Sequence, residues 1–177
     1  MTKSHAQFTD EHLDRLAKIA LEDQEGLFER ERHLAVYRRR LLLIALCQGA
    51  ALHYVQCKKG LQHTKGVKDL DVYSFYAEHP RVPWPYRRYG KADFGESEFG
   101  CHPDDLPYKG KPFIGRHVDL TGRALPVRPE GNPIEAVRIW LTTSKNPTPR
   151  HLREQAVVGL YPTRYQGTIM WDVSVDL

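Results

Sequence analysis

The sequence has few cysteines, no long apolar stretch and no low-complexity or linker segment. Its 177 residues include only Cys47, Cys57 and Cys101, an odd number that favours reduced thiols in an intracellular protein over a disulfide framework. The longest apolar stretch, Leu41 to Cys47, is too short to cross a bilayer. The first residues contain no apolar segment, so they do not have the pattern of a secretory signal. These absences predict a cytoplasmic protein that does not enter a membrane.

Several short motifs of enzymes and metal proteins are also missing. No Gly-x-Ser-x-Gly turn is present, and Gly110-Lys111 lacks the upstream glycine and the following Ser or Thr of a phosphate loop. No Cys-x-x-Cys pair supports a zinc site built from the scattered residues His53, Cys57, Cys101 and His102. The cysteines are more typical of ordinary core residues.

The composition is that of one globular domain. Hydrophobic residues make up 41% and charged residues 27% of the chain, and the mean hydropathy is −0.55, which excludes wholesale disorder. A chain of this length buries roughly two-thirds of its unfolded surface and needs no metal or disulfide to fold. No internal repeat divides it, so we expect a single domain over residues 1–177.

Positive charge is concentrated in one third of the sequence. Residues 30–91 contain thirteen Lys or Arg and four Asp or Glu, a balance of +9, whereas the whole chain carries +4. Such a segment attracts polyanions such as nucleoside triphosphates, RNA or DNA. The alternative is a solvated surface without a specific partner.

The N-terminal part has helical patterns over residues 9–39. Thr9 is followed by an acidic first turn, and apolar residues then recur with helical spacing until Gly26, which predicts an amphipathic helix. A second helical stretch is expected over about residues 28–39. The expected core begins after it, with a buried strand at Leu41–Cys47 and a helix that starts at Gly49.

Residues 68–76 are rich in β-forming side chains and carry two acids. In a strand, Asp69 and Asp71 share one face with their Cα atoms roughly 7 Å apart. Two carboxylates so placed repel each other unless a cation lies between them. Lys65 and Lys68 lie just before the two acids.

Residues 80–112 have the composition of a long loop in which prolines, aromatic rings and basic residues are interleaved. Such a loop either stacks a base and holds phosphates, or packs its rings on the core. A strand over residues 113–120 follows, and Asp119 in its interior calls for a partner. Two helices are expected over residues 132–160, and residues 167–175 are expected to form an edge strand.

In order, these features are an apolar strand leading to Gly49-Ala50, a strand bearing Asp69 and Asp71, and a later strand bearing Asp119. This order resembles the nucleotidyltransferase fold of the DNA polymerase β superfamily, in particular the minimal and AbiEii-like nucleotidyltransferases. The resemblance covers residues 41–120. It implies an α/β (α+β) protein with a small mixed sheet and flanking helices. Ala50 stands where that family usually has Gly or Ser, and the spacer of residues 51–68 is longer than usual.

The resemblance also implies a reaction, the metal-dependent transfer of a nucleoside monophosphate from a triphosphate to an acceptor. Asp69 and Asp71 would hold the nucleotide-associated Mg²⁺ or Mn²⁺, and Asp119 would complete a second metal site and act as base for the acceptor hydroxyl. The expected nucleotide-binding residues are Gly49, Ala50, Lys65 and Lys68.

A second interpretation retains the fold without the activity. In it, a catalytically silent nucleotidyltransferase-fold protein binds nucleic acid or a protein partner through the basic segment. The presence of all three carboxylates favours the enzyme, and the altered Gly49-Ala50 motif favours the silent protein. The acceptor is left open between RNA such as tRNA, a protein, a small molecule and an antibiotic-like amine.

Overall fold

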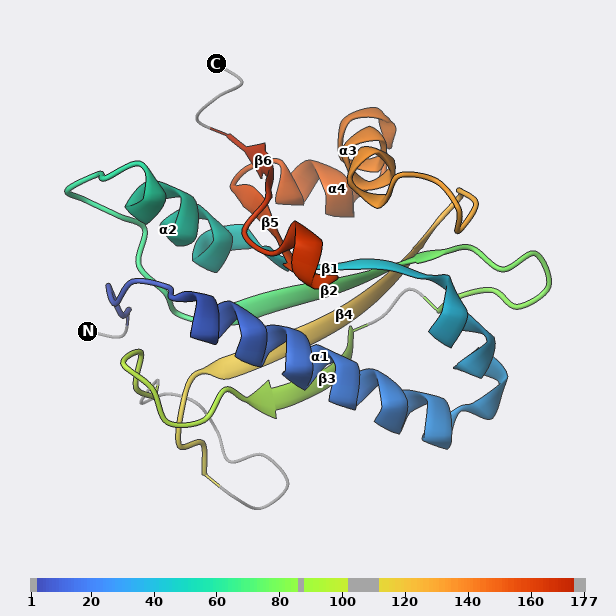
Figure 1. Ribbon diagram of the computed structural model, residues 1–177, viewed down its shortest axis with the longest axis horizontal. Coiled ribbons are helices and arrows are strands. Elements are labelled where there is room, and N and C mark those ends of the chain that lie inside the picture. Colours follow the sequence, from blue (N-terminus) through green and yellow to red (C-terminus); the bar gives the residue numbers. More distant parts are fainter. Residues whose placement is uncertain (1–2, 86–87, 102–111, 174–177) are drawn as a thin grey trace.

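The computed structural model describes residues 3–85, 88–101 and 112–173, and within them one six-stranded sheet carries helices on both faces (Figure 1). The elements in chain order are α1 (Asp10–Arg30), the 3-10 helix η1 (Arg32–Arg40), β1 (Leu41–Cys47), α2 (Gln48–Lys58), β2 (Leu70–Ala77), β3 (Arg88–Asp93), β4 (His117–Leu125), α3 (Pro133–Thr143), α4 (Pro147–Leu152), β5 (Ala156–Tyr161), the 3-10 helix η2 (Thr163–Tyr165) and β6 (Ile169–Asp172).

The sheet is mixed, with strand order β3-β4-β2-β1-β5-β6. β2 and β4 run parallel, whereas the other neighbouring strands are antiparallel. β3 and β6 therefore form the two edges. The expected α/β class with a small mixed sheet and flanking helices is confirmed. None of the helices in the described residues is long and apolar enough to span a membrane.

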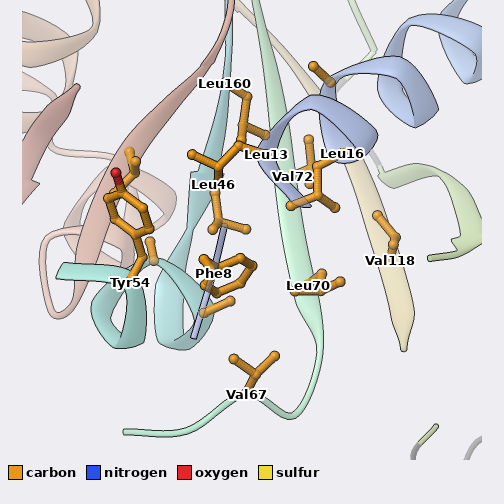
Figure 2. Packing of buried hydrophobic residues seen from close by; sticks show 14 of the residues in the cluster. Phe8, Leu13, Leu16, Leu46, Tyr54, Val67, Leu70, Val72, Val118 and Leu160 are labelled. Atoms are coloured by element: carbon orange, nitrogen blue, oxygen red, sulfur yellow. The ribbon is translucent and has the colours of Figure 1, made fainter. Parts of the chain in front are cut away.

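One face of the sheet is covered by α1 and α2 (Figures 1 and 2). Leu13 and Leu16 of α1 are fully buried against Leu46, Val72 and Val118, which come from three different strands. This packing uses the apolar stripe that the N-terminal helical pattern predicted. It commits every second residue of β2 and β4, and of β1 from Ile44 onward, to the face beneath α1.

The other face is only partly covered by helices. Val137 and Leu141 of α3 pack with α4 on Leu43, Phe75 and Val157, which belong to β1, β2 and β5. In Figure 1, α3 and α4 lie near the β5 and β6 side of the sheet. On this face, α3 and α4 therefore cover the centre and the β5 side more than the edge formed by β3.

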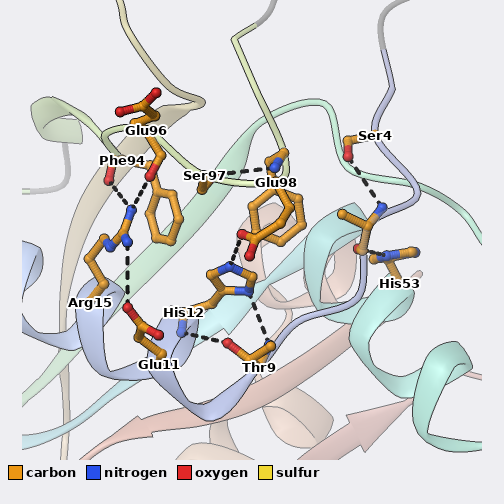
Figure 3. A network of polar contacts seen from close by, with 12 residues as sticks. Ser4, Thr9, Glu11, His12, Arg15, His53, Phe94, Glu96, Ser97 and Glu98 are labelled. Atoms are coloured by element: carbon orange, nitrogen blue, oxygen red, sulfur yellow. Dashed lines mark hydrogen bonds and ion pairs between the residues drawn. The ribbon is translucent and has the colours of Figure 1, made fainter.

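The segment after β3 is fastened to the start of α1 by a polar network (Figure 3). The His12 ring accepts a hydrogen bond from the Thr9 amide through Nδ1 (3.0 Å) and donates through Nε2 to Glu98 (2.9 Å). One turn further on, the Arg15 guanidinium donates to the carbonyl oxygens of Phe94 (3.1 Å) and Glu96 (3.0 Å). The expected Thr9 cap is present, and its helix also anchors a distant loop.

Two N-terminal boundaries differ from the sequence-based expectation. α1 continues past Gly26 to Arg30, because a glycine costs only about 1 kcal/mol in a helix whose neighbours are buried. The stretch expected as a second helix from residue 28 is the last turn of α1 followed by η1. Within the segment expected as a loop over 80–112, the structure contains strand β3.

The C-terminal expectation over residues 132–160 was partly wrong. α3 starts at Asn132-Pro133 as predicted, with the Asn132 side chain accepting from the Glu135 amide at 3.1 Å. The next helix, however, ends at Leu152, and residues 156–161 form the buried strand β5. Both faces of β5 are buried, so its apolar residues lack the period that distinguishes strand from helix. The edge strand predicted at 167–175 is present as β6, which covers Ile169–Asp172, and residues 174–175 lie outside the described residues.

Replacing Leu46 by alanine should destabilise the protein by about 2–5 kcal/mol, because this fully buried side chain joins β1 to the core beneath α1. Urea unfolding measures the loss. Val36→Ala is the control, since Val36 on η1 is 41% exposed and its truncation should change stability by less than about 0.5 kcal/mol. Equal effects of the two substitutions would contradict the assigned core.

The Glu98 contact predicts a dependence of stability on pH. The backbone amide of Glu98 and then the His12 side chain lower the pKa of this carboxyl from its ordinary value of 4.5. The charged form therefore stabilises the fold above that value, and the contribution is lost as pH falls below it. In urea unfolding, wild type should exceed Glu98→Gln at neutral pH and converge with it in acid. The exposed Glu130→Gln control should show no convergence of this kind.

Candidate functional site

Three chain segments meet at one end of the sheet. β1 ends there at Cys47, whereas β2 and β4 start there at Leu70 and His117. The antiparallel pairing of β1 with β2 and the parallel pairing of β2 with β4 produce this coincidence. The expected site residues are all near these three strand ends.

The acids on β2 and β4 lie on the face opposite α1. Val72 and Leu120 are buried in the core beneath α1. Side chains alternate along a strand, so Asp71 and Asp119 emerge on the other face. That face is the one that α3 and α4 cover only in part.

Asp71 and Asp119 are direct partners in the parallel ladder. Neighbouring strands are about 4.8 Å apart, so the two carboxylates leave the same face side by side. Asp119 is 7% exposed and Asp71 is half-buried. The same row of partners continues to Cys47 on β1 and to Lys91 on β3.

Asp69 was expected inside the strand, but it directly precedes β2 and is half-buried. Within residues 3–85, 88–101 and 112–173, no group of three or more His, Cys, Asp or Glu side chains is arranged to hold a metal ion. The joint ligation of a metal by Asp69, Asp71 and Asp119 therefore stays a prediction. What the structure brings together is the pair of Asp71 and Asp119.

His117 is a site residue that sequence reasoning missed. Its Nε2 atom lies 3.0 Å from Oδ1 of Asp119, and both side chains are largely buried. The Phe113 ring stacks on the His117 ring with centroids 5.2 Å apart and an interplanar angle of 26°. The sequence does contain a signal for this contact. His117 and Asp119 are at positions i and i+2, which places both side chains on one face of a strand.

The approach to β4 is held by Asp93 at the end of β3. Its carboxylate accepts hydrogen bonds from the amides of Gly95 (2.9 Å), Ile114 (2.6 Å) and Gly115 (2.8 Å). The backbone is so close here that a Cβ on Gly115 would lie 1.9 Å from the Gly95 carbonyl oxygen. This contact fixes the position of Phe113 at the entrance to the strand.

Arg116 connects the start of β4, which carries Asp119, to the residues just before β2, which carries Asp71. Its buried guanidinium donates through Nε to the Phe99 carbonyl (3.1 Å) and through Nη1 to the Lys68 carbonyl (3.2 Å). The residue before β4 is thus bonded to the residue that precedes Asp69. Sequence reasoning did not single out Arg116, because its partners are backbone atoms of distant segments.

The expected nucleotide-binding residues lie at the same end of the sheet. Gln48 has a φ of 62°, so the chain turns from β1 directly into α2, and no described side chain caps the first turn of this helix. The aliphatic part of Lys65 lies 3.8 Å from the Cβ position of Gly49. Ala50 is buried and offers only its backbone, whereas Lys68 is exposed.

Cys47, in the same row as the carboxylates, is not a reactive thiolate. Burial raises its pKa well above the ordinary value, and the negative charge of Asp71 raises it further. A thiol in this state neither attacks as a nucleophile nor ligates a metal readily. Cys47 is therefore a core residue beside the site.

The alternative zinc set gains no support from the structure. Nε2 of His53 donates to the Ala6 carbonyl at 2.7 Å, and burial lowers the pKa of this histidine. Cys57 lies beside His53, and burial raises the pKa of its thiol. Cys101 is exposed, and His102 and the Gly110-Lys111 pair lie outside the described residues.

The basic segment of residues 30–91 is not one continuous patch. At η1, Arg38 pairs with Glu25 at 2.8 and 2.9 Å, and Arg40 donates to the carbonyl oxygens of Ala77 and Glu78. η1 precedes β1, whereas the lysines near residue 65 follow α2, at opposite ends of the sheet (Figure 1). Arg38 and Arg40 of this segment therefore contact groups of the protein itself, which leaves less of its positive charge for a partner.

No protein-family model, no curated protein and no solved structure matches this chain, so its function is inferred from the geometry of its own residues.

Proposed function

We propose that the protein is a metal-dependent nucleotidyltransferase that moves a nucleoside monophosphate from a triphosphate to an acceptor hydroxyl. The observation that carries this proposal is the direct pairing of Asp71 and Asp119 on adjacent parallel strands and on one face. The α2 N-terminus and Gly49 lie at the same end of the sheet. The resemblance to the DNA polymerase β superfamily, first based on sequence motifs, is therefore supported by a three-dimensional arrangement as well.

The donor set fits a hard divalent cation. Mg²⁺ prefers oxygen ligands, and it is usually held by one or two carboxylates together with substrate phosphates rather than by a complete protein cage. A pair such as Asp71 and Asp119 meets that requirement without a third protein ligand. Bound Mg²⁺ or Mn²⁺ would neutralise charge on the attacking and leaving oxygens.

The chain's own residues then have separate tasks. Asp71, with Asp69 beside it, would bind the nucleotide-associated cation, and the uncapped first turn of α2 would receive phosphate oxygens with Gly49 allowing close approach. Lys65 would add a positive charge there. Asp119 would take the proton of the acceptor hydroxyl, whose oxygen bonds to the α-phosphorus while pyrophosphate leaves.

The silent protein remains the second candidate because of Ala50. This residue lacks the hydroxyl that a serine would contribute, and its side chain is buried in the core. Binding through the η1 part of the basic segment is less favoured, because Arg38 and Arg40 already contact Glu25 and backbone carbonyls.

Divalent cations should raise the melting temperature of wild type, because they relieve the repulsion between Asp71 and Asp119. In Asp71→Asn combined with Asp119→Asn, the repulsion is absent and the shift with Mg²⁺ or Mn²⁺ should disappear. Scanning fluorimetry measures both proteins, with the exposed Glu130→Gln variant as control. Equal shifts in wild type and the double variant would contradict a metal site at this pair.

Asp119→Asn should reduce nucleotide transfer by about 10² or more, because it removes the base on the acceptor side, while triphosphate binding should change little. The assay follows label from each of four radiolabelled triphosphates, with Mg²⁺ and with total RNA or cell extract as acceptor. Calorimetry measures nucleotide binding. Labelling that persists in the variant would refute the role of Asp119, and the absence of labelling by wild type would favour the silent protein.

A further inference from the structure

An exposed lysine borders the carboxylate pair on the edge strand β3. Lys91 is the direct antiparallel partner of Asp119. Ala92, the next residue, packs on the core beneath α1, so the Lys91 side chain emerges on the carboxylate face. Lys91 is exposed, and in the described part of the chain no carboxylate lies within 4.0 Å of its ammonium group. Its charge is therefore available to a ligand.

An aromatic surface adjoins the same corner. Phe113 is half-buried and stacks on His117, whose Nε2 is 3.0 Å from Asp119. His117 is the cross-strand partner of Asp93, two positions from Lys91 on β3. A positive charge and a stacked ring pair thus flank Asp119 together. Ile114, beside Phe113, is 67% exposed, so this corner presents apolar surface to solvent.

The order of residues across the strands separates two sides of the site. The row runs from Cys47 through Asp71 and Asp119 to Lys91. Gly49 and the α2 N-terminus follow the Cys47 end of this row. The nucleotide is assigned to that end, which leaves Lys91 and the ring pair on the side of the acceptor.

We propose, on the basis of the proposed function, that the acceptor is the end of a single-stranded nucleic acid. Lys91 binds a backbone phosphate, the Phe113 ring contacts a base, and the terminal hydroxyl lies at Asp119. A cation next to an aromatic platform is the usual recognition mode for single strands. A cationic amine acceptor would instead be repelled by Lys91. β3 is an edge of the sheet, so within residues 3–85, 88–101 and 112–173 no further strand pairs with its outer side.

Fluorescence anisotropy with a labelled single-stranded oligoribonucleotide of about twelve nucleotides tests this assignment. Lys91→Glu should weaken binding by about tenfold or more and reduce the slope of log affinity against log salt by about 0.7. Lys18→Glu is the matched control, because Lys18 is an exposed lysine on α1 at the opposite face, and it should change affinity less than about twofold.

Phe113→Ala should also weaken binding by about tenfold, whereas Phe113→Tyr keeps a ring and should bind as wild type does. Unchanged melting temperatures of the variants show that the fold is kept. The assignment is overturned if wild type does not bind RNA, if Lys91→Glu and Lys18→Glu lose affinity equally, or if the Tyr variant behaves like the Ala variant.

The transfer assay distinguishes this inference from the proposed function. RNA binding that depends on Lys91 and Phe113, without labelling from any triphosphate, would show an RNA-binding surface in a silent protein, and it would overturn both the enzyme and the assignment of RNA as its acceptor. Labelling of a protein or small molecule by a wild type that does not bind RNA would support the enzyme and overturn the inference.

Discussion

The parallel pairing of β2 with β4 sets two carboxylates side by side, and the rest of the structure holds them there. Asp71 and Asp119 repel each other when ionised, so their own interaction does not select this register. The opposite face selects it, because a slip by one residue would bring Val72 and Leu120 out of the core beneath α1. The hydrophobic core therefore stabilises an arrangement that repulsion between the two carboxylates alone would disfavour. Such a local conflict is typical of functional sites.

Much of the central fold could be predicted because its sequence patterns are local. The apolar run of β1 and the alternation around Asp71 indicate strands without any knowledge of their neighbours. β3 was missed because it contains Gly90 and Lys91 and has little apolar alternation. It forms where β4 supplies its hydrogen bonds and Asp23 of α1 packs over Gly90. β5 was missed for the opposite reason, since apolar residues on both of its faces hide the strand period.

The candidate site could be predicted only in part, because its membership depends on strand register. Asp69, Asp71 and Asp119 stand out in the sequence as acids within or beside apolar strands. His117, Lys91 and the links made by Asp93 and Arg116 become visible only when β3, β4 and the residues before β2 are placed side by side. No local pattern fixes which strand neighbours which. The acids could therefore be singled out from the sequence, whereas their neighbours could be found only from the tertiary pairing.

The parallel register also has a kinetic consequence. Asp71 and Asp119 are about fifty residues apart in the chain, and their strands pair only after the intervening segment has closed a long loop. β1 and β2, by contrast, are joined by the 22 residues 48–69, whereas 39 residues separate β2 from β4. Folding therefore brings the two carboxylates together in the same step that joins β3 and β4 to the other four strands. The pairing that completes the sheet is therefore also the one that creates the candidate site.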